Sequence, residues 1–411
     1  MKIYRLILFY VIIFYFNFLS SFDRSFFYRA SSFWDEPRFE RELLTTLNIQ
    51  LAGGSTYGGR NANGKKTSIF GIYGPENLNL DLQKYENFIQ KYGINCSHII
   101  DSKFIFTGAF DIFELDLNLY QNMKKGFYWH IHIPAVSLQI FPISCKQCNK
   151  NLDNLCSFDQ DELILLNNIV KTHHLSLRSI NQRGLSDSSI FLGWSINYEN
   201  TVYLDYIDFA LQLGVLFPTG KRKNPHFVFD IPLGYNGFYG ITWELDFSIG
   251  AYGWLTFGIH NDGVGFFDRA QCINIRSSQE SCTGLIRFDI AKAKEKSGPV
   301  WRTGAYIKAD HVCWGLSIFA GFNFEQKNRN TILKIYNNKN NVKLSTANNN
   351  QDLKTWNRWN LNILAEYDFA KYNKLFNPFI SILYDYSITG KRIYDTSMIG
   401  GYFGVNIAWT F

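Results

Sequence analysis

Short segments in which apolar and polar side chains alternate recur along most of this chain. The clearest runs from Ile241 to Ile249, where Ile, Trp, Leu, Phe and Ile alternate with Thr, Glu, Asp and Ser. On a helix this spacing would spread the charged side chains around the cylinder, whereas on a strand it gathers them on one face. We therefore interpret these segments as amphipathic β-strands. The same pattern occurs at 47–51, 113–119, 127–133, 190–198, 207–217, 286–290, 312–324, 359–369, 380–386 and 403–411.

The composition narrows the fold classes that can use such strands. Hydrophobic residues make up 46% of the 411 residues and aromatic residues 17%, which excludes intrinsic disorder. Beyond the N-terminus, no run approaches the roughly 20 apolar residues of a membrane-spanning helix. No repeat period is found, which argues against a propeller. A large β-sandwich and a transmembrane β-barrel remain.

The two faces of the strands favour the barrel. Aromatic side chains gather towards segment ends, as at Trp194 and Tyr198 and at Tyr252 and Trp254, which is typical of the aromatic girdles of membrane barrels. The opposite faces carry charged residues, which suit a wet interior, and a closed barrel pairs every backbone group within the hydrocarbon. We predict an all-β fold, a transmembrane antiparallel barrel of about 12 strands (roughly 10 to 14) with short helices in its loops or plug.

The N-terminus indicates export. Lys2 and Arg5 precede an apolar stretch, 6–18, and the small polar residues Ser20 and Ser21, which is the layout of a cleavable signal peptide over 1–21. An uncleaved anchor is the alternative. Losing two cationic residues lowers the formal net charge from +6 to +4 (6 − 2), a balance too mild to indicate a nucleic-acid partner.

The rest of the chain is arranged around the barrel. We assign residues 22–43 to an N-terminal periplasmic or plug segment and 44–411 to the barrel. Helical periodicity appears in an insertion near 75–93 and in another near 143–187, where 163–170 is the helical stretch. A segment near 327–355, rich in Asn and Lys, has no clean period and is interpreted as a long, mobile polar loop.

The end of the chain carries the most specific pattern. Phe403, Val405, Ile407, Trp409 and the terminal Phe411 alternate with small or polar residues. This strand resembles the C-terminal signature of Gram-negative outer-membrane β-barrel proteins, including porin-like ones. The resemblance implies an outer-membrane location in contact with its lipid, and recognition of Phe411 as an assembly signal by the barrel-assembly machinery. Pairing of this strand with the one near Leu47 is the decisive test of closure.

Cysteine usage indicates disulfides, because an exported chain meets an oxidising compartment. Of the seven cysteines, Cys145, Cys148 and Cys156 cluster, and Cys272 and Cys282 bracket a polar loop. We predict a Cys272–Cys282 disulfide, name the clustered three as further candidates, and expect Cys313 to be unpaired. Metal binding at the Cys145-x-x-Cys148 pair is the weaker alternative, because no second pair stands at the required spacing.

Catalytic motifs are sparse in this sequence. It contains neither a G-x-S-x-G elbow nor an H-E-x-x-H helix. Residues 173–176 (His-His-Leu-Ser) and Asp310-His311 would form a nucleophilic triad only if the fold brought them together. His130 and His132 share one strand face and could bind a metal, but without a third ligand they are better explained as polar residues facing the interior. We expect no enzymatic activity, no catalytic residues and no cofactor.

The polar strand faces predict a channel or porin-like transporter for small solutes. Their acidic residues outnumber the basic ones, while Lys and Arg collect in loops such as 220–224 and 292–296, so we expect a mild cation preference. Three alternatives stay open: carboxylates paired in networks that block the lumen, a surface adhesion or structural barrel acting through its long loops, and a barrel-embedded hydrolase. The predicted pore-lining residues are Glu114, Asp116, His130, His132, Asp208, Gln212, Glu244, Asp246, Arg287, Asp289, Asn360, Asn362, Glu366, Asp368 and Asn406.

Overall fold

A computed structural model describes most of the region predicted to form the barrel. It covers residues 43–77, 103–148, 156–157, 160–199, 204–276, 284–313, 315–336, 342–369 and 376–409. The predicted signal peptide, the helical stretch predicted after residue 77 and the terminal Phe411 lie outside these ranges. Among the described residues, no helix has the length and apolar character needed to cross a membrane.

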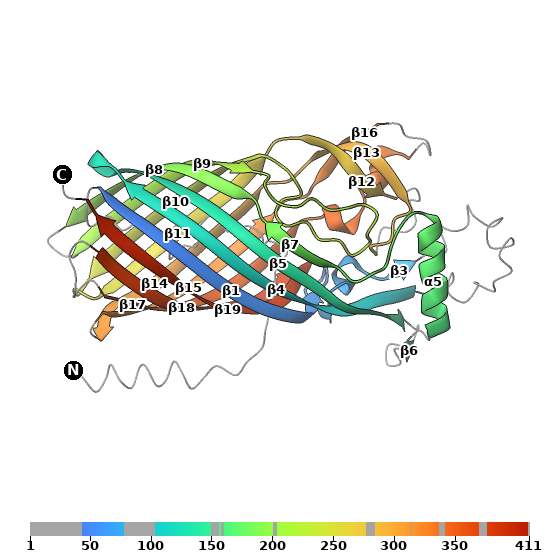
Figure 1. Ribbon diagram of the computed structural model, residues 1–411, viewed down its shortest axis with the longest axis horizontal. Coiled ribbons are helices and arrows are strands. Elements are labelled where there is room, and N and C mark those ends of the chain that lie inside the picture. The colour runs from blue at the N-terminus through green and yellow to red at the C-terminus, as the bar shows by residue number, and fades with distance from the viewer. Residues whose placement is uncertain are drawn as a thin grey trace.

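Twelve antiparallel strands close into a barrel, which confirms the predicted fold class (Figure 1). Each strand pairs with the next around the wall, and the last pairs with the first. Around the barrel they are β1 (Leu44–Arg60), β4 (Lys103–Asn122), β5 (Phe127–Cys148), β8 (Ser188–Glu199), β9 (Tyr206–Phe217), β10 (Gly240–Ala251), β11 (Leu255–Phe266), β14 (Val300–Cys313), β15 (Leu316–Lys327), β17 (Trp356–Asp368), β18 (Phe376–Lys391) and β19 (Ile393–Ala408).

Closure occurs between the strands predicted to meet. In the β1–β19 ladder Leu47 lies opposite Val405, and the N–H of Trp409 donates to the carbonyl of Leu43 at 3.2 Å. The other edge of β1 pairs with β4, where Leu47 faces Leu119. The ladder thereby closes on both edges of β1, as backbone groups in hydrocarbon require.

The alternation read from the sequence separates the two faces of the barrel wall. On β10 the side chain of Ile241 is 51% exposed on the outside, whereas that of Glu244 is 8% exposed on the inside. Exposed aromatic side chains, among them Tyr198, Tyr252 and Trp409, lie near the end where β1 begins and β19 ends. This arrangement fits an apolar belt facing lipid, bordered by an aromatic girdle.

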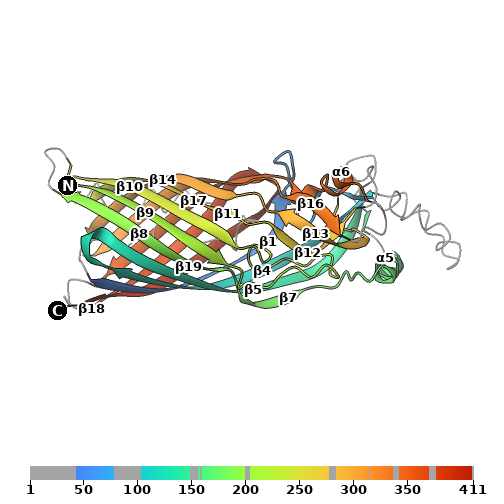
Figure 2. The same cartoon turned by 90° about the horizontal axis from the view of Figure 1, so that it is seen from above.

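The connections differ at the two ends of the barrel (Figure 2). Short turns such as 123–126 and 252–254 lie at the end where β1 begins, on the left in the figures, and long connections lie at the other end. Because barrels of this type have short periplasmic turns and long extracellular loops, we name these the periplasmic end and the outer end.

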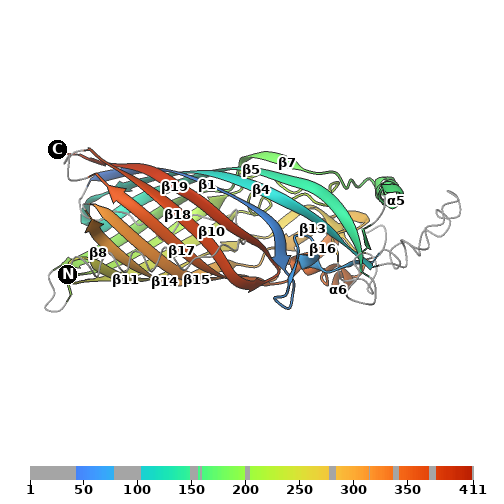
Figure 3. The ribbon, with the colours of Figure 1, turned by 90° about the horizontal axis from the view of Figure 1, so that it is seen from below.

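Strands β4 and β5 extend beyond the others at the outer end and support an apolar core there (Figure 3). Phe104, Phe106 and Phe229 pack in this core with Leu166 and Val170 of α5. The helix α5 confirms the one predicted at 163–170, and its buried residues explain its apolar periodicity. The elements of this outer assembly are β2 (Lys66–Ser68), η1 (Gly71–Tyr73), β3 (Glu76–Asn77), β6 (Cys156–Ser157), α5 (Gln160–Thr172) and β7 (Asn181–Leu185).

A separate three-stranded sheet at the outer end corrects two predictions. The segment 286–290 is not a barrel strand, because it leads into β13 of this sheet, and 327–355 is not a featureless loop, because it contains β16. Ile286 and Phe288 of the first segment pack in the apolar core that contains Phe104, whereas Ile332 of the second packs with Ile275 and Ala293 in a small core of the sheet. The sheet consists of β12 (Arg269–Ile275), β13 (Asp289–Lys296) and β16 (Thr331–Tyr336), followed by α6 (Leu344–Ala347) and η4 (Gln351–Leu353).

Two barrel strands, β11 and β14, were not predicted, although the predicted total of about 12 strands is correct. In β11 the outward-facing Asn261 and the inward-facing Val264 interrupt the alternation. The segment predicted at 312–324 joins the end of β14 to β15 through a turn at Gly315, whose φ of 104° belongs to the left-handed region that glycine adopts readily. The period alone does not reveal such a turn.

Candidate functional site

The interior of the barrel is packed with polar side chains. Most of the predicted pore-lining residues face inward, and ten of these are at most 8% exposed. At the level of these ten, the lumen is filled by side chains and is not an open pore. The buried ones are Glu114, Asp116, His130, His132, Gln212, Glu244, Asp246, Asn360, Asn362 and Asn406, and the half-buried ones are Asp208, Glu366 and Asp368.

Arg287 and Asp289 were predicted to line the pore, but the structure places them elsewhere. They belong to the segment that enters the three-stranded sheet, outside the membrane-spanning wall. The guanidinium of Arg287 forms a two-point ion pair with Asp352, with N–O distances of 2.7 and 2.8 Å. The alternation at 286–290 was correct, but it arises from the outer sheet.

Six inward-facing side chains lie directly opposite one another on six consecutive strands. We call this row the charged belt, and it consists of Gln212 (β9), Glu244 (β10), Asp262 (β11), Arg302 (β14), Glu325 (β15) and Arg358 (β17). Because barrel strands are tilted, a row along the hydrogen-bonding direction runs obliquely around the wall.

Three neighbouring pairs of the charged belt are bonded to each other. The guanidinium Nη2 of Arg302 lies 2.6 Å from Asp262 Oδ2, and that of Arg358 lies 3.3 Å from Glu325 Oε2. Gln212 donates a hydrogen bond from its amide to Glu244. Opposite charges on adjacent strands therefore compensate each other, which is what burial of charged groups requires.

Below the charged belt, on the periplasmic side, His260 bridges two carboxylates. Its Nδ1 lies 3.2 Å from Asp246 Oδ2, and its Nε2 lies 2.7 Å from Asp262 Oδ2. The hydroxyl of Tyr306 donates to Asp246 Oδ1 at 3.0 Å. This network connects the belt to the lower part of the lumen.

The two histidines considered as metal ligands take part in packing instead. The ring of His130 stacks between those of Tyr120 and Phe191, with centroid distances of 3.9 and 5.2 Å, and its Nε2 lies 3.1 Å from Asn118 Oδ1. His132 Nε2 lies 3.6 Å from Asp116 Oδ1. No group of three metal-ligating side chains occurs among the residues that the structure describes.

An aromatic cluster fills another part of the lumen wall. Tyr306, Phe319, Phe379 and Tyr402 are buried against one another on β14, β15, β18 and β19. The hydroxyl end of the Tyr306 ring closely approaches the backbone of β11 at Gly258, where a Cβ atom would overlap it. A glycine is therefore needed at this position for the ring to reach the wall.

We expect Gly258→Ala to lower the free energy of unfolding by about 1–3 kcal/mol, because the ring of Tyr306 must move. Urea unfolding of the protein in detergent, followed by tryptophan fluorescence, measures the change. Gly265→Ala is the matched control, because it lies on the same strand and a Cβ there meets nothing within 4 Å. Equal effects of the two substitutions would contradict the proposed close approach.

The loop between β9 and β10, residues 218–239, covers the outer mouth of the lumen. Tyr235 of this loop packs on Phe191, Val264 and Val300 from the inner face of the barrel. The buried carboxylate of Asp187 holds the loop in place by accepting the N–H of Gly220 at 3.0 Å and that of Tyr235 at 2.5 Å. Burial raises the pKa of Asp187 to about 6, although these N–H groups oppose the rise.

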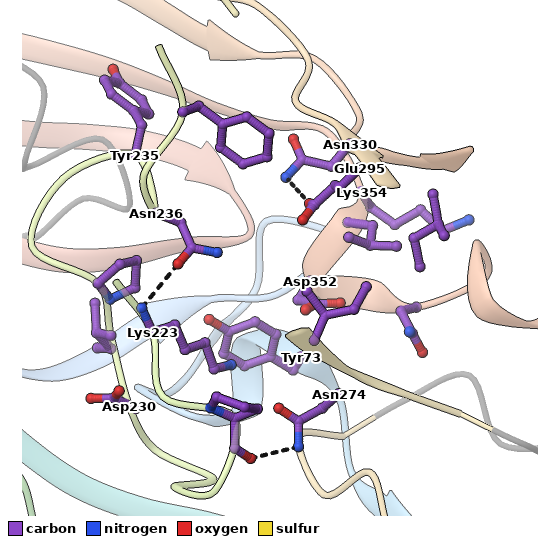
Figure 4. A pocket seen from close by; sticks show the side chains of 18 of the residues that line it. Tyr73, Lys223, Asp230, Tyr235, Asn236, Asn274, Glu295, Asn330, Asp352 and Lys354 are labelled. Atoms are coloured by element: carbon purple, nitrogen blue, oxygen red, sulfur yellow. Dashed lines mark hydrogen bonds between the residues drawn. The ribbon is translucent and has the colours of Figure 1, made fainter. Parts of the chain in front are cut away.

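A cavity of about 220 Å³ lies beside this loop and was not foreseen from the sequence (Figure 4). Lys327 and Trp356 line it, and they stand two residues beyond Glu325 and Arg358 on the inner faces of the same strands. The cavity therefore lies directly on the outer side of the charged belt. The remaining lining comes from η1, β12, β13, β16, η4, β19, the 218–239 loop and residues that adjoin these elements.

The cysteine and triad predictions have different outcomes. Cys145, Cys272 and Cys313 are free thiols, so the predicted Cys272–Cys282 disulfide is not seen; Cys282 and the side chains of Cys148 and Cys156 lie outside the described part. The residues considered for a triad are far apart. His173, His174 and Ser176 follow α5 at the outer end, whereas Asp310 lies near the periplasmic end of β14.

The closed barrel with its polar interior and apolar exterior defines the fold of outer-membrane β-barrel proteins, which confirms the resemblance noted at the C-terminus. Among solved structures, an outer-membrane channel from Pseudomonas putida F1 is similar, with a TM-score of 0.50, 11% identity and coverage of 90% of this chain and 99% of that chain. This likeness shows the fold alone.

Two further solved structures are more distant. The TodX ΔS2S3 mutant, a monoaromatic hydrocarbon channel, has a TM-score of 0.35, 7% identity and coverage of 90% and 92%. The translocator domain of the autotransporter NalP from Neisseria meningitidis has a TM-score of 0.34, 9% identity and coverage of 90% and 90%. No protein-family profile and no curated protein matches this sequence.

Proposed function

We propose that this protein is an outer-membrane channel for small solutes, and that the charged belt is its gate. The belt is the observation that carries the proposal. Buried ion pairs stabilise a fold little, and apolar residues of similar volume often serve equally well or better. Ionisable groups placed at membrane depth typically mark a path for ions or polar solutes. A barrel that needed only to be filled would not require six polar and charged residues in one row.

The same interior supports a mild cation preference. Acidic side chains that face inward, such as Asp246, Asp208 and Asp385, outnumber the inward-facing basic side chains Arg302, Lys308, Lys327 and Arg358. An excess of carboxylates along a pore raises the local concentration of cations. The predicted signal peptide and recognition of Phe411 by the barrel-assembly machinery complete this proposal for an exported, lipid-embedded protein.

Planar-bilayer recordings under a KCl gradient test both parts of the proposal. We expect measurable conductance and a reversal potential with the sign that a cation-selective pore gives. Asp208→Asn should make this reversal potential smaller, because the half-buried carboxylate of Asp208 lies near the periplasmic mouth. Asp268→Asn is the control, since that exposed residue lies outside the barrel wall. An anionic sign would overturn the preference, and a folded protein without conductance or solute permeation would overturn the channel.

A second candidate, surface adhesion or a structural role, is favoured by the ordered outer assembly with its own apolar core. It predicts a folded barrel that neither conducts ions nor passes solutes in liposome swelling. For the embedded-hydrolase alternative, the residues considered as a triad lie at opposite ends of the barrel.

A further inference from the structure

The cavity above the charged belt has the features of a binding site. It is a recess of about 220 Å³ at the outer end, large enough for a small organic molecule but small compared with sites for drug-sized ligands. Its walls come from segments far apart in the sequence, including η1, the 218–239 loop and the three-stranded sheet (Figure 4). A solute entering the barrel from outside would meet this cavity before the belt.

The lining of the cavity carries charges of both signs, and these nearly balance: its acidic side chains are Asp230, Glu295 and Asp352, and its basic ones are Lys223, Arg287, Lys327 and Lys354. Arg287 and Asp352 form the two-point ion pair already described. Glu295 accepts hydrogen bonds from Gln271 and Asn330 at 2.9 and 3.0 Å. Burial raises the pKa of Glu295, while the Gln271 bond and the charge of Lys327 lower it.

Asp230 is close enough to Lys223 for the lysine charge to act on its carboxyl. Burial raises the pKa of Asp230, and the N–H of Asn224 together with the charge of Lys223 opposes the rise. Lys354 is the remaining cation of the lining, and its Nζ lies 3.2 Å from the side-chain oxygen of Asn349. With three acidic and four basic side chains in the lining, the net charge is small, which favours a neutral ligand over an ionic one.

The surface offered to such a ligand combines an aromatic ring with amide groups. Figure 4 shows Tyr73 in the middle of the cavity, between Lys223 on one side and Asp352 on the other. Its hydroxyl bonds to that of Tyr394 at 2.9 Å, which fixes the ring. A fixed aromatic face packs well against the C–H side of a sugar-like ring, whose hydroxyls then point to polar neighbours.

Asn236 supplies a positioned amide at the same place. Its φ of 54° and the φ of 84° at Gly237 belong to the left-handed region, and the N–H of Phe238 donates to the carbonyl of Tyr235 at 3.2 Å, so these residues form a tight turn. The side-chain oxygen of Asn236 accepts the N–H of Lys223 at 2.9 Å, which turns the amide nitrogen towards the cavity (Figure 4).

We propose that this cavity binds a neutral, polyhydroxylated solute of about monosaccharide size, with its ring on Tyr73 and a hydroxyl bonded to the amide of Asn236. This inference names the solute class of the proposed channel, and its transport role rests on that proposal. Binding itself can be measured on the closed protein.

Isothermal titration calorimetry of the full barrel in detergent tests the inference. The probes are neutral hexoses and pentitols, compared with benzoate and glutamate at the same concentrations. We expect at least one neutral probe to bind and Tyr73→Leu to weaken its binding about tenfold, because the aromatic face is lost. Tyr73→Phe is the matched control: it keeps the ring, loses the same hydroxyl and should bind nearly as well as the original protein.

A second pair of variants tests the amide. Asn236→Gly keeps the left-handed turn but removes the side chain, and should weaken binding about fivefold through loss of one hydrogen bond. Asn224→Gly removes a comparable bond in the same loop, in which the side-chain oxygen of Asn224 accepts the N–H of His226 outside the cavity, and it should leave binding unchanged.

The outcomes separate the two proposals. Stronger binding of benzoate or glutamate than of every neutral probe, no binding by any probe, or equal effects of Tyr73→Leu and Tyr73→Phe would overturn the cavity assignment. Binding of a neutral probe without its permeation in liposome swelling would instead overturn the channel and leave the binding site standing.

Discussion

Replacing Glu325 and Arg358 together with alanine is expected to raise the single-channel conductance several-fold. The two residues lie directly opposite each other on β15 and β17, and both side chains are buried in the lumen. Their removal takes two long side chains out of the charged belt and opens space where the interior is packed. Because an acid and a base leave together, the net charge of the belt is unchanged, and Arg302 keeps its ion pair with Asp262, so we expect the barrel to fold.

The control for this variant is the double substitution of Phe324 and Trp359 with alanine. These residues are the adjacent cross-strand pair, with ring centroids 4.6 Å apart, and they alternate with Glu325 and Arg358 and so face the opposite side of the wall. Their loss should leave conductance unchanged while costing comparable or greater packing. Bilayer recordings of both variants in KCl provide the comparison. If the lumen variant conducts no better than the control, the belt is not the constriction.

Lowering the pH from 8 to 5 is expected to strengthen the outer assembly around Glu76. This carboxyl on β3 accepts the N–H groups of Leu285 and Ile286, the latter at 3.2 Å, and so ties two long loops together. Burial raises the pKa of Glu76 from 4.5 to about 7, against the lowering effects of these N–H groups and of Arg276 and Arg287. The folded form thus favours the protonated carboxyl.

The sign of the pH effect follows from that shift. The stabilising contribution is full below pH 4.5, is lost as the pH rises towards about 7, and is absent above it. Hydrogen exchange of a peptide covering 284–288, corrected for the intrinsic pH dependence of exchange, should show protection falling about ten- to a hundredfold between pH 5 and 8. Glu76→Gln should flatten this dependence. A slope that survives in Glu76→Gln would assign it to another group.

The fold was largely predictable because alternation is a local property of the sequence. In a segment such as 241–249, the alternation alone indicates which side chains lie on the apolar outer face and which lie on the polar inner face. The C-terminal pattern predicted the closing strand for the same reason. The segment 286–290 shows the limit, because alternation marks a half-buried strand without telling which sheet contains it.

The charged belt was missed because it depends on register between strands. Asp262 and Arg302 lie on the two strands that were not predicted, Glu325 lies one residue after the predicted segment 312–324, and Arg358 lies one residue before 359–369. Strand ends are the least certain part of a sequence-based assignment. The cavity could not be predicted from the sequence, because its walls come together only when the long loops have folded.

Closure of the barrel also constrains how the chain can assemble. Thr46 and Asn406 are 360 positions apart, yet their side chains bond at 2.7 Å across the final seam. Without β19, the neighbouring strands would each present a row of unpaired N–H and C=O groups to hydrocarbon, and each such group costs several kcal/mol. We therefore expect that a chain stopped before β19 would not be stable in the membrane, and that stable insertion requires the last strand.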